Sequence, residues 1–373
     1  MLQLLLGGSG SGKTTLLYQR IRARAEKGEK SILLVPEQFT SSTEGRIYRE
    51  LGDALSGMVE SFSFTSLAEK ILSTEGGAAV QTLSDAGRAV LVRRALEELQ
   101  DNVHYYHRHR RSAAFCQMAA QTIDELKSAG LSGRQLAQLA GACGAESGKL
   151  SELALIFQGY ETLLARSGMD PSDRLELAGA RLEEALARHS LPEFLRDRAV
   201  FIDEFDTFNA PKKRLLGAML AALPSVTVAL CDDGAPLLPG DLSLFSGAKQ
   251  VAAQLRQLAR KNGAEVAVPQ LLRKDLRHRN APGLAAVAEL LETGSCTADA
   301  PAGEVRLFAA PSREEEARAA AGAIRRLMRQ GVRCGKIAVV CRDIARYRAA
   351  VRYEFRMADI PLYCDEPTTP EFS

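Results

Sequence analysis

The feature that most constrains the fold of this chain is a glycine-rich loop near the N-terminus, Gly7-Gly8-Ser9-Gly10-Ser11-Gly12-Lys13-Thr14. The loop fits the phosphate-loop pattern G-x-x-x-x-G-K-[ST] at every defined position. An apolar run at 2–6 precedes it, and a helix-forming stretch at 13–27 follows it. A strand, a loop of this kind and a helix in succession predict an α/β fold built on a parallel sheet.

The chemistry of this loop predicts that ATP and Mg²⁺ bind there. Glycines let the backbone turn its N–H groups toward phosphate oxygens, and the following helix presents the positive end of its dipole to the same anion. Lys13 would add a charge at the β- and γ-phosphates, and the Thr14 hydroxyl would coordinate Mg²⁺. The predicted nucleotide-binding residues are Gly7, Gly8, Ser9, Gly10, Ser11, Gly12, Lys13, Thr14 and Thr15.

Further apolar runs complete the predicted sheet. Residues 31–35, 199–202 and 226–231 have the pattern of buried strands, residues 210–222 form a helix between the last two, and residues 265–268 form a short final strand. We therefore expect a P-loop, RecA-like α/β domain. Its second strand and its third lie far apart in the sequence, which requires an insertion between them.

Helical periodicity dominates that insertion. The predicted helices are 84–100, 112–129, 150–166 and 173–189. We expect an all-helical subdomain at 66–190, inserted into a nucleotide-binding domain made of 1–65 and 191–300. Residues 301–373 then predict a partial second α/β domain. It would contain strands at 304–308 and 336–341 and helices at 312–330 and 343–357.

A pair of carboxylates follows one of the buried strands. Asp203 and Glu204 end the run Val200-Phe201-Ile202. A nucleotide site needs one carboxylate for Mg²⁺ and another to orient water, so we assign Asp203 to the metal and Glu204 to catalysis. A solvated acidic loop is the alternative, and Asp232-Asp233 after the strand at 226–231 is a weaker competitor.

The composition narrows the class of protein only slightly. With 46% apolar and 25% charged residues, the chain can bury a hydrophobic core. Its net charge of +2 neither requires nor excludes binding to nucleic acid. No apolar run reaches the roughly 18 residues that span a bilayer, and we expect a cytoplasmic protein without membrane contact. Its seven cysteines form no CxxC pair, which argues against a disulfide framework or a zinc site.

Six segments, spread over most of the chain, identify a family by resemblance. They are GGSGSGKT, ILLVPEQFT, SFSFTSLAEKIL, AFCQMAAQTIDELKSAGL, FIDEFDTFNAPKKRLLGAML and REEEARAAAGAIRRLMRQGVRCGKIAVVCRD. Their order is similar to that of superfamily-one helicases, and together they resemble the opening part of the B subunit of AddAB-type ATP-dependent helicase–nucleases. The phosphate loop combined with VPEQFT is the most specific part of this resemblance.

The resemblance implies a role in processing double-strand DNA breaks for recombinational repair. The partners would be single- or double-stranded DNA and an A subunit in a heterodimer. The nuclease site and iron–sulfur cysteines of such proteins lie toward the C-terminus, so we expect neither activity nor cluster here. Active helicases of this type carry a glutamine after the strand at 226–231, and this sequence has Cys231-Asp232-Asp233 instead.

The resemblance also suggests an arginine and several DNA contacts. Arg342 follows the strand expected at 336–341 and resembles the helicase arginine that reaches the γ-phosphate, although a solvated arginine is the alternative. The candidate DNA contacts are Gln38, Thr40, Ser63 and Phe64, together with Arg108 and Arg110, which the basic and aromatic composition of residues 104–111 suggests. Core packing of Phe64 and a solvated basic loop around Arg108 are the competing interpretations. Two other functions stay open: a P-loop kinase or transferase, and a catalytically silent subunit that scans DNA.

Overall fold

The computed structural model describes residues 1–77, 79, 81–142, 144, 147–295 and 304–364. The chain divides into two compact units, Met1–Ala298 and Asp299–Ser373. The first unit carries the phosphate loop and both predicted carboxylates. None of the helices in the described ranges is long and apolar enough to cross a membrane.

The first unit is built on a sheet of six parallel strands in the order β3-β2-β4-β5-β1-β6. The strands are β1 (Leu2–Gly7), β2 (Ser31–Leu34), β3 (Val59–Phe62), β4 (Ala199–Ile202), β5 (Ser225–Cys231) and β6 (Gln270–Leu272). The predicted P-loop α/β fold class is confirmed. The last strand lies at 270–272, and Val266 of the expected strand makes only an isolated bridge to Leu2.

Alternation along the strands sends apolar side chains into cores on both faces of the sheet. Leu4 and Leu6 of β1 belong to one core, whereas Leu5 belongs to the other. In β4, Ile202 belongs to the first of these cores and Phe201 to the second. Buried runs of this kind are typical of parallel sheets that helices cover on both sides.

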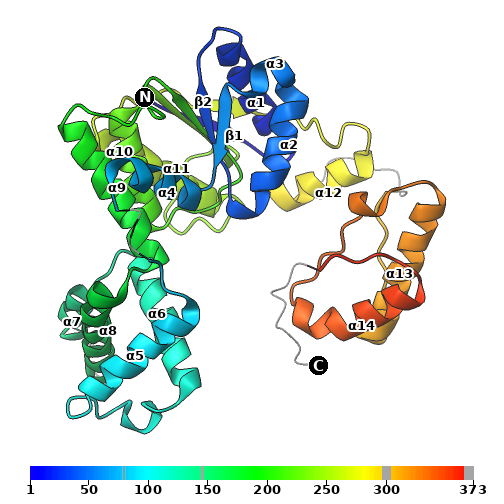
Figure 1. The fold of residues 1–373 in the computed structure, drawn as a ribbon. Coiled ribbons are helices and arrows are strands. Elements are labelled where there is room, and N and C mark those ends of the chain that lie inside the picture. The colour runs from blue at the N-terminus through cyan, green and yellow to red at the C-terminus, as the bar shows by residue number, and fades with distance from the viewer. Residues whose placement is uncertain (78, 80, 143, 145–146, 296–303, 365–373) are drawn as a thin grey trace. The chain divides into compact units, whose positions relative to one another are not determined.

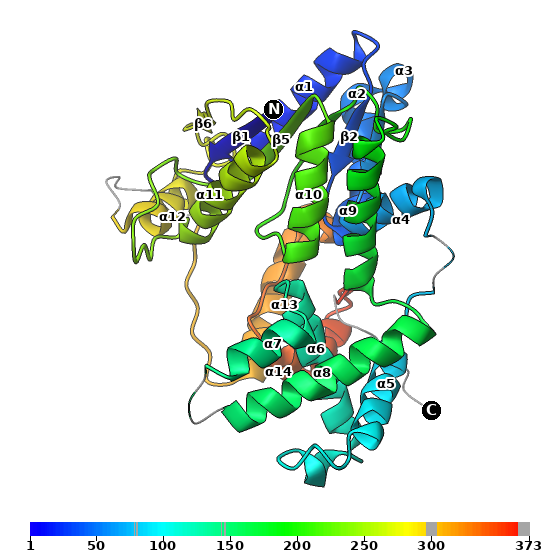
Figure 2. The same ribbon diagram turned by 90° about the vertical axis from the view of Figure 1, so that its left-hand side faces the viewer.

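Helices form a layer on each face of the sheet (Figures 1 and 2). Helix α1 (Lys13–Ala25) and helix α2 (Thr40–Leu51) contribute to one core, next to the short α3 (Asp53–Ser56). The other face is covered by α4 (Phe64–Glu75), α9 (Pro171–Ala187), α10 (Ala210–Ala222) and α11 (Ser246–Lys261). This three-layer arrangement leaves the carboxyl ends of the strands available for a site.

Four helices have a hydrophobic core of their own, which we call the helical core. They are α5 (Asp85–Glu98), α6 (Ala113–Ser128), α7 (Gly133–Ala140) and α8 (Ser147–Ser167). The insertion expected at 66–190 is longer than this core, because α4 and α9 at its two ends pack with the sheet. The helical core therefore lies between two helices that belong to the sheet layer.

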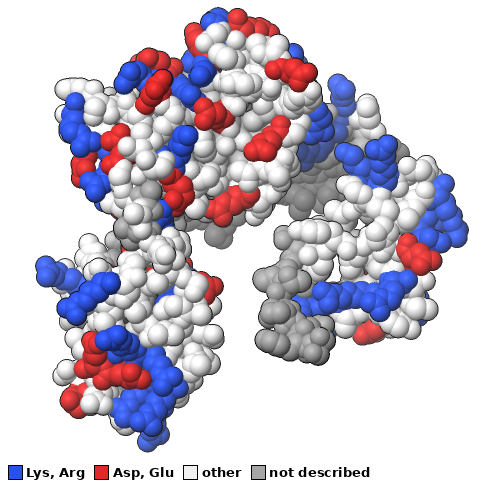
Figure 3. Space-filling view, viewed as in Figure 1, with Lys and Arg blue, Asp and Glu red and all other residues white. Residues whose placement is uncertain are grey.

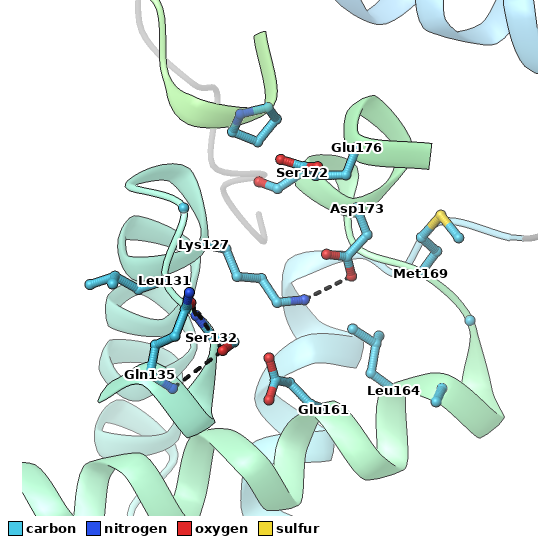
Figure 4. Close-up of a pocket in the computed structure, with 14 residues that line it drawn as sticks. Lys127, Leu131, Ser132, Gln135, Glu161, Leu164, Met169, Ser172, Asp173 and Glu176 are labelled. Atoms are coloured by element: carbon cyan, nitrogen blue, oxygen red, sulfur yellow. Dashed lines mark hydrogen bonds and ion pairs between the residues drawn. The ribbon is translucent and has the colours of Figure 1, made fainter. Parts of the chain in front are cut away.

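A buried ionic network joins the helical core to α9. The Lys127 ammonium lies 2.7 Å from Asp170 Oδ2 and 2.7 Å from Asp173 Oδ2, and the Tyr160 hydroxyl donates to Asp170 Oδ1 at 2.6 Å. Figure 4 shows Lys127 and Asp173 in a cavity of about 500 Å³. Burial opposes the charge on Lys127, but the two carboxylates outweigh it and raise the pKa of Lys127. The network thus links α6, α8 and α9.

The second unit differs from its prediction. Helices α13 (Arg313–Arg329) and α14 (Ile344–Met357) form where expected and pack around Phe355. The described part of this unit contains no strand, although strands were predicted at 304–308 and 336–341. Leu307 is 100% and Val340 90% exposed, because these extended segments have no neighbouring strand with which to form a ladder.

Candidate nucleotide-binding site

The parallel sheet brings the phosphate loop and two acidic segments to one edge. Strand β1 ends at Gly7, where the loop begins, and Asp203 follows β4. The Asp203 N–H donates to Leu34 O at 3.1 Å, and the Asp232 N–H donates to Gly7 O at 3.2 Å. Ligands of open parallel sheets bind at such an edge, outside the carboxyl ends of the strands.

The phosphate loop presents backbone donors to a concave surface. Gly10 has φ 82° and Gly12, which precedes α1, has φ 90°, values that favour glycine. Within the described ranges, the N–H groups of Gly10, Gly12 and Lys13 have no hydrogen-bond acceptor. Unpaired donors at a helix N-terminus form a site for an anion such as phosphate.

Two side chains of the loop also fit a phosphate group. Lys13 Nζ folds back onto the loop and donates to Gly7 O at 2.8 Å and Gly8 O at 2.9 Å. Burial lowers the pKa of Lys13. The Ser11 hydroxyl is buried and has no hydrogen-bond partner among the described residues. A bound anion would satisfy both this orphaned hydroxyl and a lysine whose hydrogen bonds within the described ranges go to backbone carbonyls.

Thr14 and Asp203 lie together as oxygen ligands for a cation. The buried Asp203 carboxylate and the Thr14 side chain line the same cavity. Burial raises the pKa of Asp203, and the Thr14 side chain, the Glu204 N–H and the charge of Lys13 oppose that rise. Hydroxyl and carboxylate oxygens suit Mg²⁺, which usually takes only one or two ligands from protein and the rest from phosphate and water.

Glu204 faces the same cavity as Thr14. This cavity, of about 240 Å³, is lined by Thr14, Tyr18, Arg46, Asp203 and Glu204 among others. The Glu204 backbone has φ 64°, which is uncommon outside glycine, and its N–H donates to Asp203 Oδ1 at 3.1 Å. Burial and the neighbouring Asp203 raise the pKa of Glu204. The strained turn thus directs a second carboxylate toward the metal ligands.

A basic segment, residues 273–279, contacts the phosphate loop. Arg277 Nη1 donates to Ser9 Oγ at 3.1 Å, and the Leu276 N–H donates to Gly10 O at 3.0 Å. Asp275 shapes this turn by accepting from the Arg277 and His278 N–H groups, both at 3.0 Å. Arg277 was not among the residues predicted from the sequence, where the basic run at 273–279 is its one signal.

Helix α12 (Pro282–Thr293) brings an acidic side chain to the same loop. A cavity of about 360 Å³ is lined by Gly8, Ser11, Asp232 and Glu292 among others. A Cβ placed on Gly8 would lie 2.6 Å from Glu292 Oε1, so the carboxylate contacts the loop directly. A negative charge at this position opposes the binding of a phosphate.

The acidic segment after β5 has local structural contacts. The buried Asp232 accepts from the Gly234 N–H at 2.7 Å, and burial raises its pKa. Asp233 Oδ2 lies 3.3 Å from Lys249 Nζ, which also contacts Asp241 at 3.3 Å. These residues therefore shape the loop after β5, where the resemblance to helicases predicts a glutamine.

The candidate DNA contacts near the sheet have structural roles of their own. Phe64 is 2% exposed and packs against Phe205 and Phe208 with ring centroids 5.2 and 6.0 Å away. Ser63 caps α4 by accepting from the Ser66 N–H at 3.1 Å. The Thr40 hydroxyl donates to Glu37 O within its own turn. DNA binding by these residues stays a prediction, as it does for the exposed Gln38.

The remaining predicted residues lie on segments that are distant in the sequence from the phosphate loop. Arg108 and Arg110 belong to the connection between α5 and α6 in the helical core. Arg342 is exposed and precedes α14 in the second unit. Its approach to a γ-phosphate stays a prediction.

Comparisons with known proteins agree on one family. The family model described as "ADDB, N-terminal" matches residues 4–288. Three similar proteins are each named as the B subunit of an ATP-dependent helicase/deoxyribonuclease. They come from Desulforudis audaxviator (34% identity over 378 residues), Symbiobacterium thermophilum (33% over 393) and Moorella thermoacetica (32% over 381). The matches cover 98, 99 and 98% of this chain but 32% of each relative, so the chain spans about a third of their length.

Proposed function

Because this chain belongs to the AddB family through its N-terminal domain, we propose that it is the ATP-binding, helicase-like part of a subunit that processes DNA ends for recombinational repair. Its relatives are named as subunits of an ATP-dependent helicase and deoxyribonuclease. DNA and an A subunit are the partners that this name implies. Membership of this family argues against the alternative function of a P-loop kinase or transferase.

The observation that carries this proposal is the convergence of the phosphate loop with Thr14, Asp203 and Glu204. Lys13 and the free N–H groups of the loop would hold the β- and γ-phosphates. Thr14 and Asp203 would hold Mg²⁺, with Asp203 acting through bound water. MgATP would supply the phosphoanhydride bond whose hydrolysis drives movement along DNA. Glu204 is the carboxylate placed to orient a water molecule and accept its proton.

Two arginines would add positive charge. Arg277 already contacts Ser9 of the phosphate loop, which favours it as a group that stabilises phosphate charge. Arg342 of the second unit is the other candidate, on the basis of its resemblance to the helicase arginine. The helical core would form an inserted subdomain that contacts DNA, and residues 304–364 would contribute to a second helicase-like domain.

A silent scanning subunit is the second candidate, and two observations favour it. Residues 232–249, directly after β5, contain no glutamine, and Glu292 places a negative charge against Gly8. The intact pair Asp203 and Glu204 favours hydrolysis instead. The two candidates therefore share nucleotide binding and differ in turnover.

The rate of ATP hydrolysis, measured with and without single-stranded DNA, distinguishes these candidates. We expect turnover that DNA increases and that Glu204→Gln abolishes while ATP still binds. ATP binding without turnover in the wild-type chain would support the scanning subunit. Failure of the chain to bind ATP at all would contradict both.

A further inference from the structure

The connection between α5 and α6 is the most basic stretch of the helical core. Residues His104 to Arg111 contain three arginines, three histidines and two tyrosines, and no carboxylate. Figure 3 shows Lys and Arg side chains gathered at the lower end of the helical core, next to a smaller acidic group. We call residues 104–111 the basic loop.

One carboxylate fixes the backbone of the basic loop. Glu152 of α8 accepts from the His104 N–H at 2.8 Å, from the Tyr105 N–H at 2.7 and 2.8 Å, and from the Tyr106 N–H at 3.1 Å. Burial would raise the pKa of Glu152, but these backbone bonds outweigh it and lower that pKa. Tyr106 also packs against Phe115 of the helical core, with ring centroids 5.2 Å apart. These contacts tie residues 104–106, at the start of the basic loop, to α8 and α6 without any bound partner.

The arginines of the basic loop differ from those of α5. Arg93 and Arg94 on α5 pair with Glu97 and Glu98 at 3.1 and 3.3 Å. In the described part of the chain, Arg108, Arg110 and Arg111 form no ion pair. Three neighbouring cations without a carboxylate repel one another, and an anionic partner relieves that repulsion.

An aromatic ring accompanies these charges. Tyr105 is 55% exposed, and Lys149 Nζ lies 5.4 Å from the centroid of its ring. Basic groups that follow a phosphate backbone, next to an exposed ring on which a base can stack, are typical of non-specific nucleic-acid sites. A carboxylate-rich protein surface would use the charges but not the ring.

We propose that the basic loop is a preorganised DNA-backbone site, in which Glu152 sets the conformation, Arg108, Arg110 and Arg111 contact phosphates, and Tyr105 contacts a base. This inference rests on the proposed function, since it assumes that the chain acts on DNA. It deepens that function by naming the residues of the helical core that contact DNA and the carboxylate that positions them. The Glu152 carboxylate is a positioning residue, because its oxygens are bonded to the loop backbone.

Equilibrium binding of the full chain to fluorescein-labelled DNA, without nucleotide, tests this proposal. A 30-nucleotide single strand and a hairpin duplex with a single-stranded tail are titrated between 50 and 200 mM KCl. The double variant Arg108→Ala/Arg111→Ala should weaken binding and reduce the slope of log Kd against log salt. The reduction should be roughly 1.4 on the single strand and roughly 1.8 on the duplex, as expected for two lost phosphate contacts.

Arg93→Ala/Arg94→Ala is the matched control, because it removes the same charge from the same group of helices. It should leave both slopes and affinities nearly unchanged. Equal effects of the two double variants would overturn the proposal, because they would show only a response to net charge. Unchanged DNA binding with weaker association of the A subunit would also overturn it, and would assign the loop to an acidic protein surface.

A second variant separates conformation from charge. Glu152→Ala removes a negative charge next to the loop, so a purely electrostatic site would bind DNA more tightly. A preorganised site should bind more weakly, because the loop loses its four backbone bonds and must be ordered on binding. Tighter binding by Glu152→Ala would refute the positioning role. ATP affinity of each variant, measured in parallel, shows whether the nucleotide site stays intact, so failure of this proposal is distinct from failure of the proposed function.

Discussion

Replacing Lys127 with methionine should destabilise the first unit by about 3 kcal/mol. Methionine keeps the length of the buried stem but removes the ammonium that lies 2.7 Å from Asp170 and 2.7 Å from Asp173. Breaking one side of a buried ion pair costs about 3–5 kcal/mol, because the remaining charge stays buried without compensation. The junction between the helical core and α9 should therefore be the first part of this unit to weaken.

The structure places the expected cost at the lower end of that range. Asp170 is 1% exposed and would be stranded, but it keeps its hydrogen bond from the Tyr160 hydroxyl at 2.6 Å. Asp173 is 33% exposed, so water can replace its partner. Only Asp170 would thus bear the full cost of a buried charge without a partner, which gives a destabilisation of about 3 kcal/mol.

Thermal unfolding followed by circular dichroism at 222 nm measures this cost. At about 2–4 °C for each kcal/mol in a domain of this class, Lys127→Met should lower Tm by about 6–12 °C. Arg93→Met is the control, because its ion pair with Glu97 is exposed and worth at most about 0.5 kcal/mol. A Lys127→Met variant that melts within 2 °C of this control would refute the assignment of the network as the link between the helices.

Three further predictions concern the phosphate loop. Glu292→Gln should lower the Kd for MgATP by about two- to fivefold, since a charge about 6–8 Å from phosphate in a solvated setting is worth roughly 0.5–1 kcal/mol; an unchanged Kd in a calorimetric titration would contradict this. Asp203→Asn should stabilise the nucleotide-free chain against thermal unfolding by about 0.5–2 kcal/mol, because burial disfavours that charge, and should abolish the Mg²⁺ dependence of ATP binding. Gly10→Ala should weaken nucleotide binding and also destabilise the fold. Gly10 has φ 82°, and a Cβ at this position would lie 2.7 Å from the Arg277 Cβ. Gly28→Ala is its control, with φ 77° but no atom within 4 Å, and should cost only about 1 kcal/mol; equal losses of ATP affinity would contradict the close approach.

Local patterns predicted the elements that have clear boundaries. The strand Ala199–Ile202 and the helix Ala210–Ala222 occur where predicted, because an apolar run and an Asn-Ala-Pro start signal fix them. Strand β3 (Val59–Phe62) was missed, since four residues with a central Glu and Ser give too weak a pattern. Its place in the sheet comes from pairing with β2, which no local signal shows.

Contacts between distant residues were the main limit on predicting the site. The phosphate loop, Asp203 and Glu204 could be proposed from the sequence because each follows a recognisable strand. Arg277 contacts Ser9 across 268 residues of sequence, and nothing in the run at 273–279 indicates which loop it covers. Helix α12 was missed for the same reason, because its contact with the phosphate loop is set by the folded chain.

Calorimetric titration of the chain with MgATP tests most directly whether the phosphate loop is a nucleotide site. The account predicts saturable binding to the wild-type chain, which Lys13→Ala weakens about 10- to 100-fold through loss of charge-assisted hydrogen bonds to phosphate. Lys27→Ala, an exposed lysine just beyond α1, should bind as the wild type does. Equal affinities of the Lys13→Ala and wild-type chains would contradict the account, because ATP would then bind somewhere other than the phosphate loop.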